Sequence, residues 1–163
     1  MFDYNTISDV ILHFDYTASS DESLRGVVQG AASGIVDSVQ DRLESDGIVR
    51  AFSLKDEFPA QNARLVAGEE IDLNITSDFL PFFLQSAKVK AATLAFAGAK
   101  GEAASVGAVK VDGKQLGTVT TDDALGASTV ALAGDSVPWH HRLQVTGMPA
   151  DARSWLILKF TSN

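Results

Sequence analysis

The sequence contains no cysteine. This absence excludes disulfide bonds, thiolate nucleophiles and cysteine-based zinc sites. The chain also lacks any uninterrupted apolar run near the roughly 18 residues that a transmembrane helix needs. Its first residues, MFDYNTISD, contain neither a basic region nor an apolar one, so we expect no signal peptide in this chain.

Basic side chains are scarce as well. Thirteen Lys and Arg stand against 21 Asp and Glu, which gives a net charge of −8, and no basic cluster is present. Because this charge repels phosphate backbones and anionic lipid headgroups, we expect neither nucleic acid nor a membrane surface as a partner. The 163 residues with 45% hydrophobic content fit one globular domain, residues 1–163, with a single core.

The first part of the chain predicts a strand followed by a helix. Apolar and polar residues alternate from Val10 to Thr17, which is typical of a strand with one apolar face. A helix is expected from about Asp21 to Ser45, capped by Ser19 or Ser20. It is amphipathic, because its apolar residues keep helical spacing. Glycines recur at every fourth position on one face, and we expect this face to pack closely against a sheet or another backbone: Gly26, Gly30 and Gly34.

The rest of the chain predicts short strands separated by turn signals. The pair Asp112 and Gly113 lies between alternating runs and predicts a two-residue hairpin. Pro81 argues against a strand in SDFLPFFL, whose other apolar residues we expect to be mostly buried. The fold class is therefore mainly β, an antiparallel β-sandwich of about eight strands with one helix inserted after the first strand. The strands predicted after the helix are Gly47–Leu54, Glu70–Ile75, Ala87–Phe96, Val106–Val111, Gln115–Thr120, Ser128–Leu132, His140–Val145 and Trp155–Phe160.

The histidines do not form a metal-ligand pattern. His140 and His141 are adjacent in a predicted strand, so their rings face opposite sides of the sheet, and His13 is far away in sequence. We expect one exposed histidine and one packed beside Trp139. No metal and no cofactor are predicted.

Acidic side chains could bind calcium or act in catalysis, but their spacing in the sequence matches neither kind of site. Asp122 and Asp123 lie in a loop without the spacing of an EF-hand, and a solvated turn is the preferred interpretation over structural calcium. The acidic runs SDES, DEF and GEEID are typical of a solvated surface, although paired carboxylates could serve glycoside hydrolysis. No G-x-S-x-G elbow and no phosphate-binding glycine loop occur. We predict no catalytic residue and no enzyme.

Aromatic side chains offer candidate contact residues. Trp139 follows Pro138 near a loop, and it is a candidate contact residue together with His140 and His141. Trp155 opens the apolar strand SWLILKF, where burial in the core is expected. Because tryptophan rings stack on sugars, a carbohydrate-binding β-sandwich module is the alternative function.

Three segments resemble a known family. They are FDYNTISDVILHFDYTAS, FSLKDEFPAQNARL and DLNITSDFLPFFLQ. They are similar to the C-terminal region of the A component of Tc-type insecticidal toxin complexes, which also occurs in large proteins with a neuraminidase-like segment. The similarity covers residues 2–84, and beyond them only the strand-rich character and the closing WLILKF agree.

The resemblance implies a docking domain without catalytic residues. In such bacterial toxins the A component forms a pentameric channel, and its C-terminal domain helps to bind the B component. It further implies self-association through the parent A-type protein and a place in an extracellular, secreted virulence complex. On this basis we expect the chain to be a piece of the C-terminal end of a much larger polypeptide.

Overall fold

The computed structural model describes residues 21–85, 87–134 and 137–162. The chain divides into two compact units, Met1–Gly34 and Ile35–Asn163, and each is described by itself. The strand predicted at Val10–Thr17 and the predicted caps Ser19 and Ser20 lie outside the described residues.

Helix α1 spans Glu22–Ser45, as the apolar spacing predicts. Asp21 caps its start, because one carboxylate oxygen accepts hydrogen bonds from the Ser23 backbone N–H at 2.9 Å and from the Ser23 hydroxyl at 2.6 Å. At its end the backbone N–H of Gly47 donates to the carbonyl of Arg42 at 2.9 Å. Gly47 has φ 76°, and a Cβ there would lie 2.6 Å from the Phe160 carbonyl oxygen, so this turn into the first described strand requires glycine.

The apolar residues of α1 are mostly exposed. Among the described residues of this helix only Leu43 is buried. A Cβ built at Gly26, Gly30 or Gly34 meets no atom of the described residues within 4 Å. The close packing expected for the glycine face is therefore not found within the described part of the chain. The large apolar side chains of α1 that are exposed are Leu24, Val27, Val28, Ile35 and Val36.

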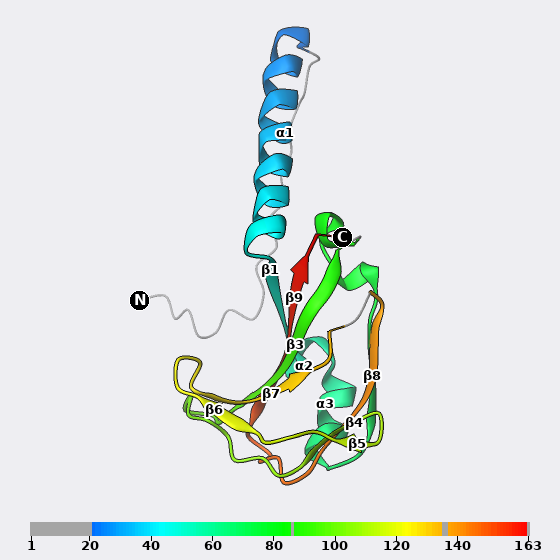
Figure 1. Ribbon diagram of the computed structural model, residues 1–163, viewed down its shortest axis with the longest axis vertical. Coiled ribbons are helices and arrows are strands. Elements are labelled where there is room, and N and C mark those ends of the chain that lie inside the picture. Colours follow the sequence, from blue (N-terminus) through cyan, green and yellow to red (C-terminus); the bar gives the residue numbers. More distant parts are fainter. Residues whose placement is uncertain (1–20, 86, 135–136, 163) are drawn as a thin grey trace, which may run out of the picture. The chain divides into compact units, whose positions relative to one another are not determined.

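Two antiparallel sheets form the second unit, which confirms the mainly β fold (Figure 1). The five-stranded sheet has the order β1-β9-β3-β7-β6, and the four-stranded sheet has the order β2-β8-β4-β5. The described residues thus contain nine strands. Those of the first sheet are β1 Ile48–Ser53, β3 Lys88–Ala97, β6 Thr120–Asp122, β7 Ala127–Leu132 and β9 Arg153–Thr161. Those of the second are β2 Ile71–Ile75, β4 Val109–Val111, β5 Lys114–Gln115 and β8 Trp139–Val145.

The predicted hairpin is confirmed. Val111 pairs with Lys114 across a two-residue turn, in which Asp112 has φ 50° and Gly113 has φ 77°. Positive φ at both positions is the signature of a type I′ turn. The strand predicted over Gln115–Thr120 is wrong in extent, because β5 ends at Gln115 and β6 begins at Thr120.

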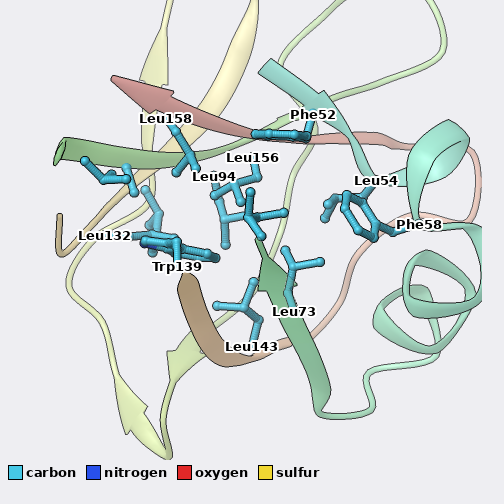
Figure 2. Packing of buried hydrophobic residues seen from close by; sticks show 14 of the residues in the cluster. Phe52, Leu54, Phe58, Leu73, Leu94, Leu132, Trp139, Leu143, Leu156 and Leu158 are labelled. Atoms are coloured by element: carbon cyan, nitrogen blue, oxygen red, sulfur yellow. The ribbon is translucent and has the colours of Figure 1, made fainter. Parts of the chain in front are cut away.

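The core lies between the two sheets (Figure 2). Leu94 and Leu156 from one sheet and Leu73 and Leu143 from the other are fully buried and point toward one another. Burial of a leucine or phenylalanine side chain contributes about 1.5–3 kcal/mol to folding. Strand β9 alternates buried and partly exposed residues along its length, so one of its faces serves this core.

Two short helices that the sequence reading missed follow β1. They are α2, Leu54–Glu57, and α3, Pro59–Val66. The Ser53 hydroxyl accepts a hydrogen bond from the Asp56 backbone N–H, while the Glu57 carboxylate accepts one from the Ser53 backbone N–H. Serine followed by acids, and proline at the first position of the next helix, are helix-start signals that this stretch does contain.

The segment SDFLPFFL forms two 3₁₀ turns, η2 at Ser77–Phe79 and η3 at Phe82–Leu84. Leu80 and Leu84 are buried, but Phe82 is 75% exposed and Phe79 and Phe83 are partly exposed. The expectation that this run is mostly buried is therefore wrong for its phenylalanines. A 3₁₀ turn has three residues per turn, so successive side chains point in three directions and only one can face the core.

Candidate docking surface

An apolar hollow of about 490 Å³ lies in the second unit. One wall is the last turns of α1 and the other is the 3₁₀ turn η3 with the residues that follow it. The lining is dominated by aliphatic and aromatic side chains. It comprises Ile35, Val36, Val39, Gln40, Leu43, Glu44, Phe82, Phe83, Ala87 and Ser162.

Local sequence builds both walls. Ile35, Val39 and Leu43 recur every four residues and therefore share one side of the helix. On the other wall Phe82 and Phe83 contact each other edge to face, with ring centroids 5.4 Å apart and an interplanar angle of 85°. This aromatic contact favours one orientation of the two rings beside the hollow.

Several apolar side chains that line the hollow are largely exposed to solvent. Ile35 is 67% exposed, Val36 is 49% exposed and Phe82 is 75% exposed. Single exposed apolar residues are ordinary, but a contiguous apolar patch marks an interaction site. The arrangement can bind an apolar segment of another molecule.

Helix α1 also carries acidic side chains in its second half. Asp37, Asp41 and Glu44 have the spacing i, i+4 and i+7, and of the three only Glu44 lines the hollow. Within the described part of the chain no Lys, Arg or His lies within 4.0 Å of these carboxylates. The hollow itself is therefore lined by one carboxylate, that of Glu44.

The two histidines lie where the strand register places them. On β8, His140 is exposed and its Nε2 lies 2.5 Å from a carboxylate oxygen of Asp72. His141 is largely covered, and its ring lies against Trp139 with centroids 4.6 Å apart. The predicted division into one exposed histidine and one packed beside Trp139 is confirmed.

Trp139 itself is not available as a contact residue, which corrects the sequence reading. Its side chain is 0% exposed and lies in the core near Leu132, as Figure 2 shows. Its indole N–H donates to the Ala133 carbonyl at 3.5 Å. The position after Pro138 indicated a loop, but Trp139 is the first residue of β8 and faces the other sheet.

Asp112 ties the β4–β5 hairpin to β8. One carboxylate oxygen accepts the Arg142 backbone N–H at 2.9 Å, and the other lies 2.7 Å from Nδ1 of His141. These hydrogen bonds, led by the one from Arg142, lower the pKa of the Asp112 carboxyl from its ordinary value. The group has a structural role, since the backbone N–H of Asp112 also donates to the Arg142 carbonyl at 2.8 Å.

Acids that were considered for catalysis or for calcium binding are engaged in separate local contacts. Glu57 pairs with Arg50 at 2.7 Å and Glu69 pairs with Arg64 at 2.8 Å. Asp122 accepts backbone N–H groups of its own turn, at Ala124 and Leu125. Within the described ranges no three His, Asp or Glu side chains are grouped so that they could hold a metal ion. None of the described helices is long and apolar enough to span a membrane.

Trp155 lies on the outer face of the five-stranded sheet. It is only partly buried, so the expectation of core burial is wrong for this residue. The alternation in SWLILKF predicts this arrangement. Leu156, Leu158 and Phe160 face the core, and Trp155 therefore lies on the opposite face of the strand. A shallow hollow of about 270 Å³ lies beside it, lined by Ala95, Ala97, Gly101, Leu125, Ala127, Trp155 and Ile157.

No protein-family model, curated protein or solved structure matches this chain.

Proposed function

We propose that this chain is a non-enzymatic protein-interaction domain that docks another protein through the apolar hollow beside α1. The observation that carries the proposal is the exposed aromatic wall, with Phe82 75% exposed beside Ile35 and Val36. Burying this surface against a partner would remove apolar area from water, at about 25 cal/mol per Å². Aromatic side chains, including phenylalanine, are enriched at protein interfaces.

The chemistry of the hollow supports binding over catalysis. Its lining contains one carboxylate, that of Glu44, beside the neutral polar side chains Gln40 and Ser162. Enzyme sites commonly combine a nucleophile or acid with a second ionisable group that activates it. An apolar lining with one ionisable group instead favours recognition by shape and burial.

The partner class follows from the family resemblance. Similarity to the C-terminal region of a Tc toxin A component implies that the partner is the toxin B component, met in an extracellular complex. It also implies that the parent A-type protein is pentameric. The residues similar to the family include SDFLPFFL, the same segment that forms the aromatic wall.

A binding experiment tests the proposal. The chain and the assembled parent protein are each mixed with the cognate B component, and association is measured by light scattering and calorimetry. Phe82→Ser should weaken binding strongly. Leu125→Ser, at an apolar residue 57% exposed in another turn, is the matched control. Absence of association by both the chain and the parent assembly would contradict the proposal.

A second candidate function is carbohydrate binding on the outer sheet face. It is favoured by the partly exposed Trp155 ring beside the small side chains of Ala95, Ala97 and Ala127, which leave a hollow next to the indole. An exposed tryptophan face can stack on the apolar face of a sugar. Glycan-array binding that is lost in Trp155→Ala but kept in Phe82→Ser would establish this function.

A further inference from the structure

Strand β1 lies at one edge of the five-stranded sheet. Within the described residues it pairs only with β9, so its opposite side faces no neighbouring strand. An uncovered edge offers unpaired N–H and C=O groups to any other strand, including the same strand of a second copy. Folded proteins therefore usually close such an edge with side chains, a bulge or a covering segment.

Two charged side chains occupy this edge. The guanidinium of Arg50 donates from Nη1 to the Ala51 carbonyl at 2.9 Å, and from Nη2 to a carboxylate oxygen of Glu57 at 2.7 Å. The other carboxylate oxygen of Glu57 accepts the Ser53 backbone N–H at 3.0 Å. One acceptor and one donor of the strand backbone are therefore bonded to side chains of the chain itself.

The Ser53 N–H shows which backbone groups face the open side of β1. It bonds to Glu57, so it points away from β9. Because successive residues of an antiparallel strand alternate between the two sides, Ala51 and Val49 also direct their N–H and C=O groups away from β9. An added strand would bond to the Ala51 carbonyl and the Ser53 N–H, and side chains already occupy both groups.

We propose that Arg50 and Glu57 form an edge cap that prevents β1 from pairing with the β1 of a second copy. Two identical edges can pair about a two-fold axis, since each strand supplies the donors and acceptors that the other needs. Val49 is 59% exposed and Ala51 is exposed, so the outer face of the edge would add apolar contacts. This inference does not depend on the docking function, because neither residue of the edge cap lines the hollow.

Neighbouring groups hold the edge cap in place. The guanidinium carbon of Arg50 lies 4.6 Å from the centroid of the Phe52 ring, which is a cation–π contact. Glu57 belongs to α2, whose start is fixed by the hydrogen bond from the Asp56 N–H to the Ser53 hydroxyl at 3.3 Å. Because the hydrogen bonds of the edge cap involve charged groups, an added strand would have to break strong bonds before it could pair.

The test removes both charges of the edge cap at once. Arg50→Ala with Glu57→Ala leaves the net charge at −8 and frees the Ala51 carbonyl and the Ser53 N–H. This variant should self-associate at a concentration at least about tenfold lower than wild type, because pairing no longer breaks charge-assisted hydrogen bonds. Sedimentation velocity over a concentration series measures the association. Hydrogen exchange should show that the Val49 and Ala51 amides are protected in the associated form.

The matched control is Arg25→Ala with Glu22→Ala, which removes an exposed ion pair of α1 and also keeps the net charge. It should not change self-association. If the Arg50→Ala and Glu57→Ala variant does not fold, Glu57→Gln compared with Glu22→Gln repeats the test with milder changes, and the same direction is expected.

A rescue variant separates strand pairing from unfolding. Val49→Pro, added to Arg50→Ala with Glu57→Ala, removes an N–H on the open side and no hydrogen bond to β9. Proline at this position blocks strand addition, so the triple variant should return to the behaviour of wild type.

Three results would overturn the inference. The first is a double variant whose Ser53 amide exchanges faster but which associates no more than wild type. The second is equal association of the Arg25→Ala and Glu22→Ala control, which would attribute the effect to the loss of any ion pair. The third is association that Val49→Pro does not reverse, since unfolding or exposure of the Phe52 ring would then explain it.

Discussion

The interior between the two sheets and the hollow beside α1 are both apolar, but they are built differently. In the interior Trp139, Leu94 and Leu156 are fully buried and contact side chains from the facing sheet. At the hollow Ile35 and Phe82 remain more than half exposed. The comparison separates apolar residues that stabilise the fold from apolar residues left available for a partner.

The largest expected effect is in the interior. Trp139→Ala should destabilise the protein by about 3–5 kcal/mol, because it removes a fully buried ring and leaves a cavity. Urea unfolding followed by circular dichroism measures the change. A loss below about 1 kcal/mol would show that Trp139 is not part of the packed core.

The glycine that links α1 to β1 gives the next largest effect. Gly47→Ala should destabilise by more than about 1 kcal/mol, since φ is positive and the added Cβ would lie 2.6 Å from a carbonyl oxygen. Thermal unfolding measures it, with Gly113→Ala as a comparison in which φ is also positive but no atom is within 4 Å. Equal losses in both variants would attribute the effect to φ alone.

A substitution on the exposed surface of α1, at Gly30, is expected to raise stability and not to lower it. Gly30→Ala should raise stability by up to about 1 kcal/mol, because alanine has the better helix propensity and its Cβ would meet no described atom. Close packing of the glycine face, as the sequence predicts, would instead make a larger side chain in Gly30→Leu destabilising. Thermal unfolding of the full chain measures both variants, and a lower unfolding temperature in both would support close packing of this face.

Asp112 makes a smaller, pH-dependent contribution. Its lowered pKa means that the folded state favours the carboxylate, so its stabilisation is present above the ordinary pKa of about 4 and is lost as pH falls through the lowered value. The stability difference between wild type and Asp112→Asn should therefore be largest above pH 5 and should shrink as pH falls below the ordinary pKa of an aspartate. Asp123→Asn, at an exposed acid of the β6–β7 turn, is the control, and a difference that persists in acid would contradict the assignment.

The smallest effect on stability is expected at the hollow. Phe82→Ser should change the free energy of unfolding by less than about 0.5 kcal/mol, since the ring is 75% exposed. The same substitution should reduce binding of the partner, which gives the sharpest contrast with Trp139→Ala. A strong loss of stability would show that this aromatic wall belongs to the core.

Sequence patterns predicted the elements that local chemistry determines. Helix α1, most strands and the Asp112–Gly113 hairpin follow from apolar spacing and from residues that tolerate positive φ. The pair of histidines was also predictable, because neighbours on a strand must face opposite sides. Helices α2 and α3 were missed, although Ser53 and Pro59 carry ordinary helix-start signals.

The candidate surface was not predictable in the same way. Apolar residues of α1 and the phenylalanines around Pro81 carry the composition of a core, and sequence alone assigns them to one. The same reason explains the two tryptophans. The sequence predicts Trp155 in the core and Trp139 as a contact residue, but Trp139 is buried and Trp155 is partly exposed. Either ring could be buried, and only the facing sheet decides which of them is covered.

The sequence by itself determined a cysteine-free, acidic, mainly β chain with one long helix, because composition and short-range periodicity are local properties. Tertiary structure alone decided which apolar side chains are covered. Coverage depends on residues distant in the chain, as where η3 meets the last turns of α1, and no local pattern records that meeting. The hollow is therefore a property of the fold.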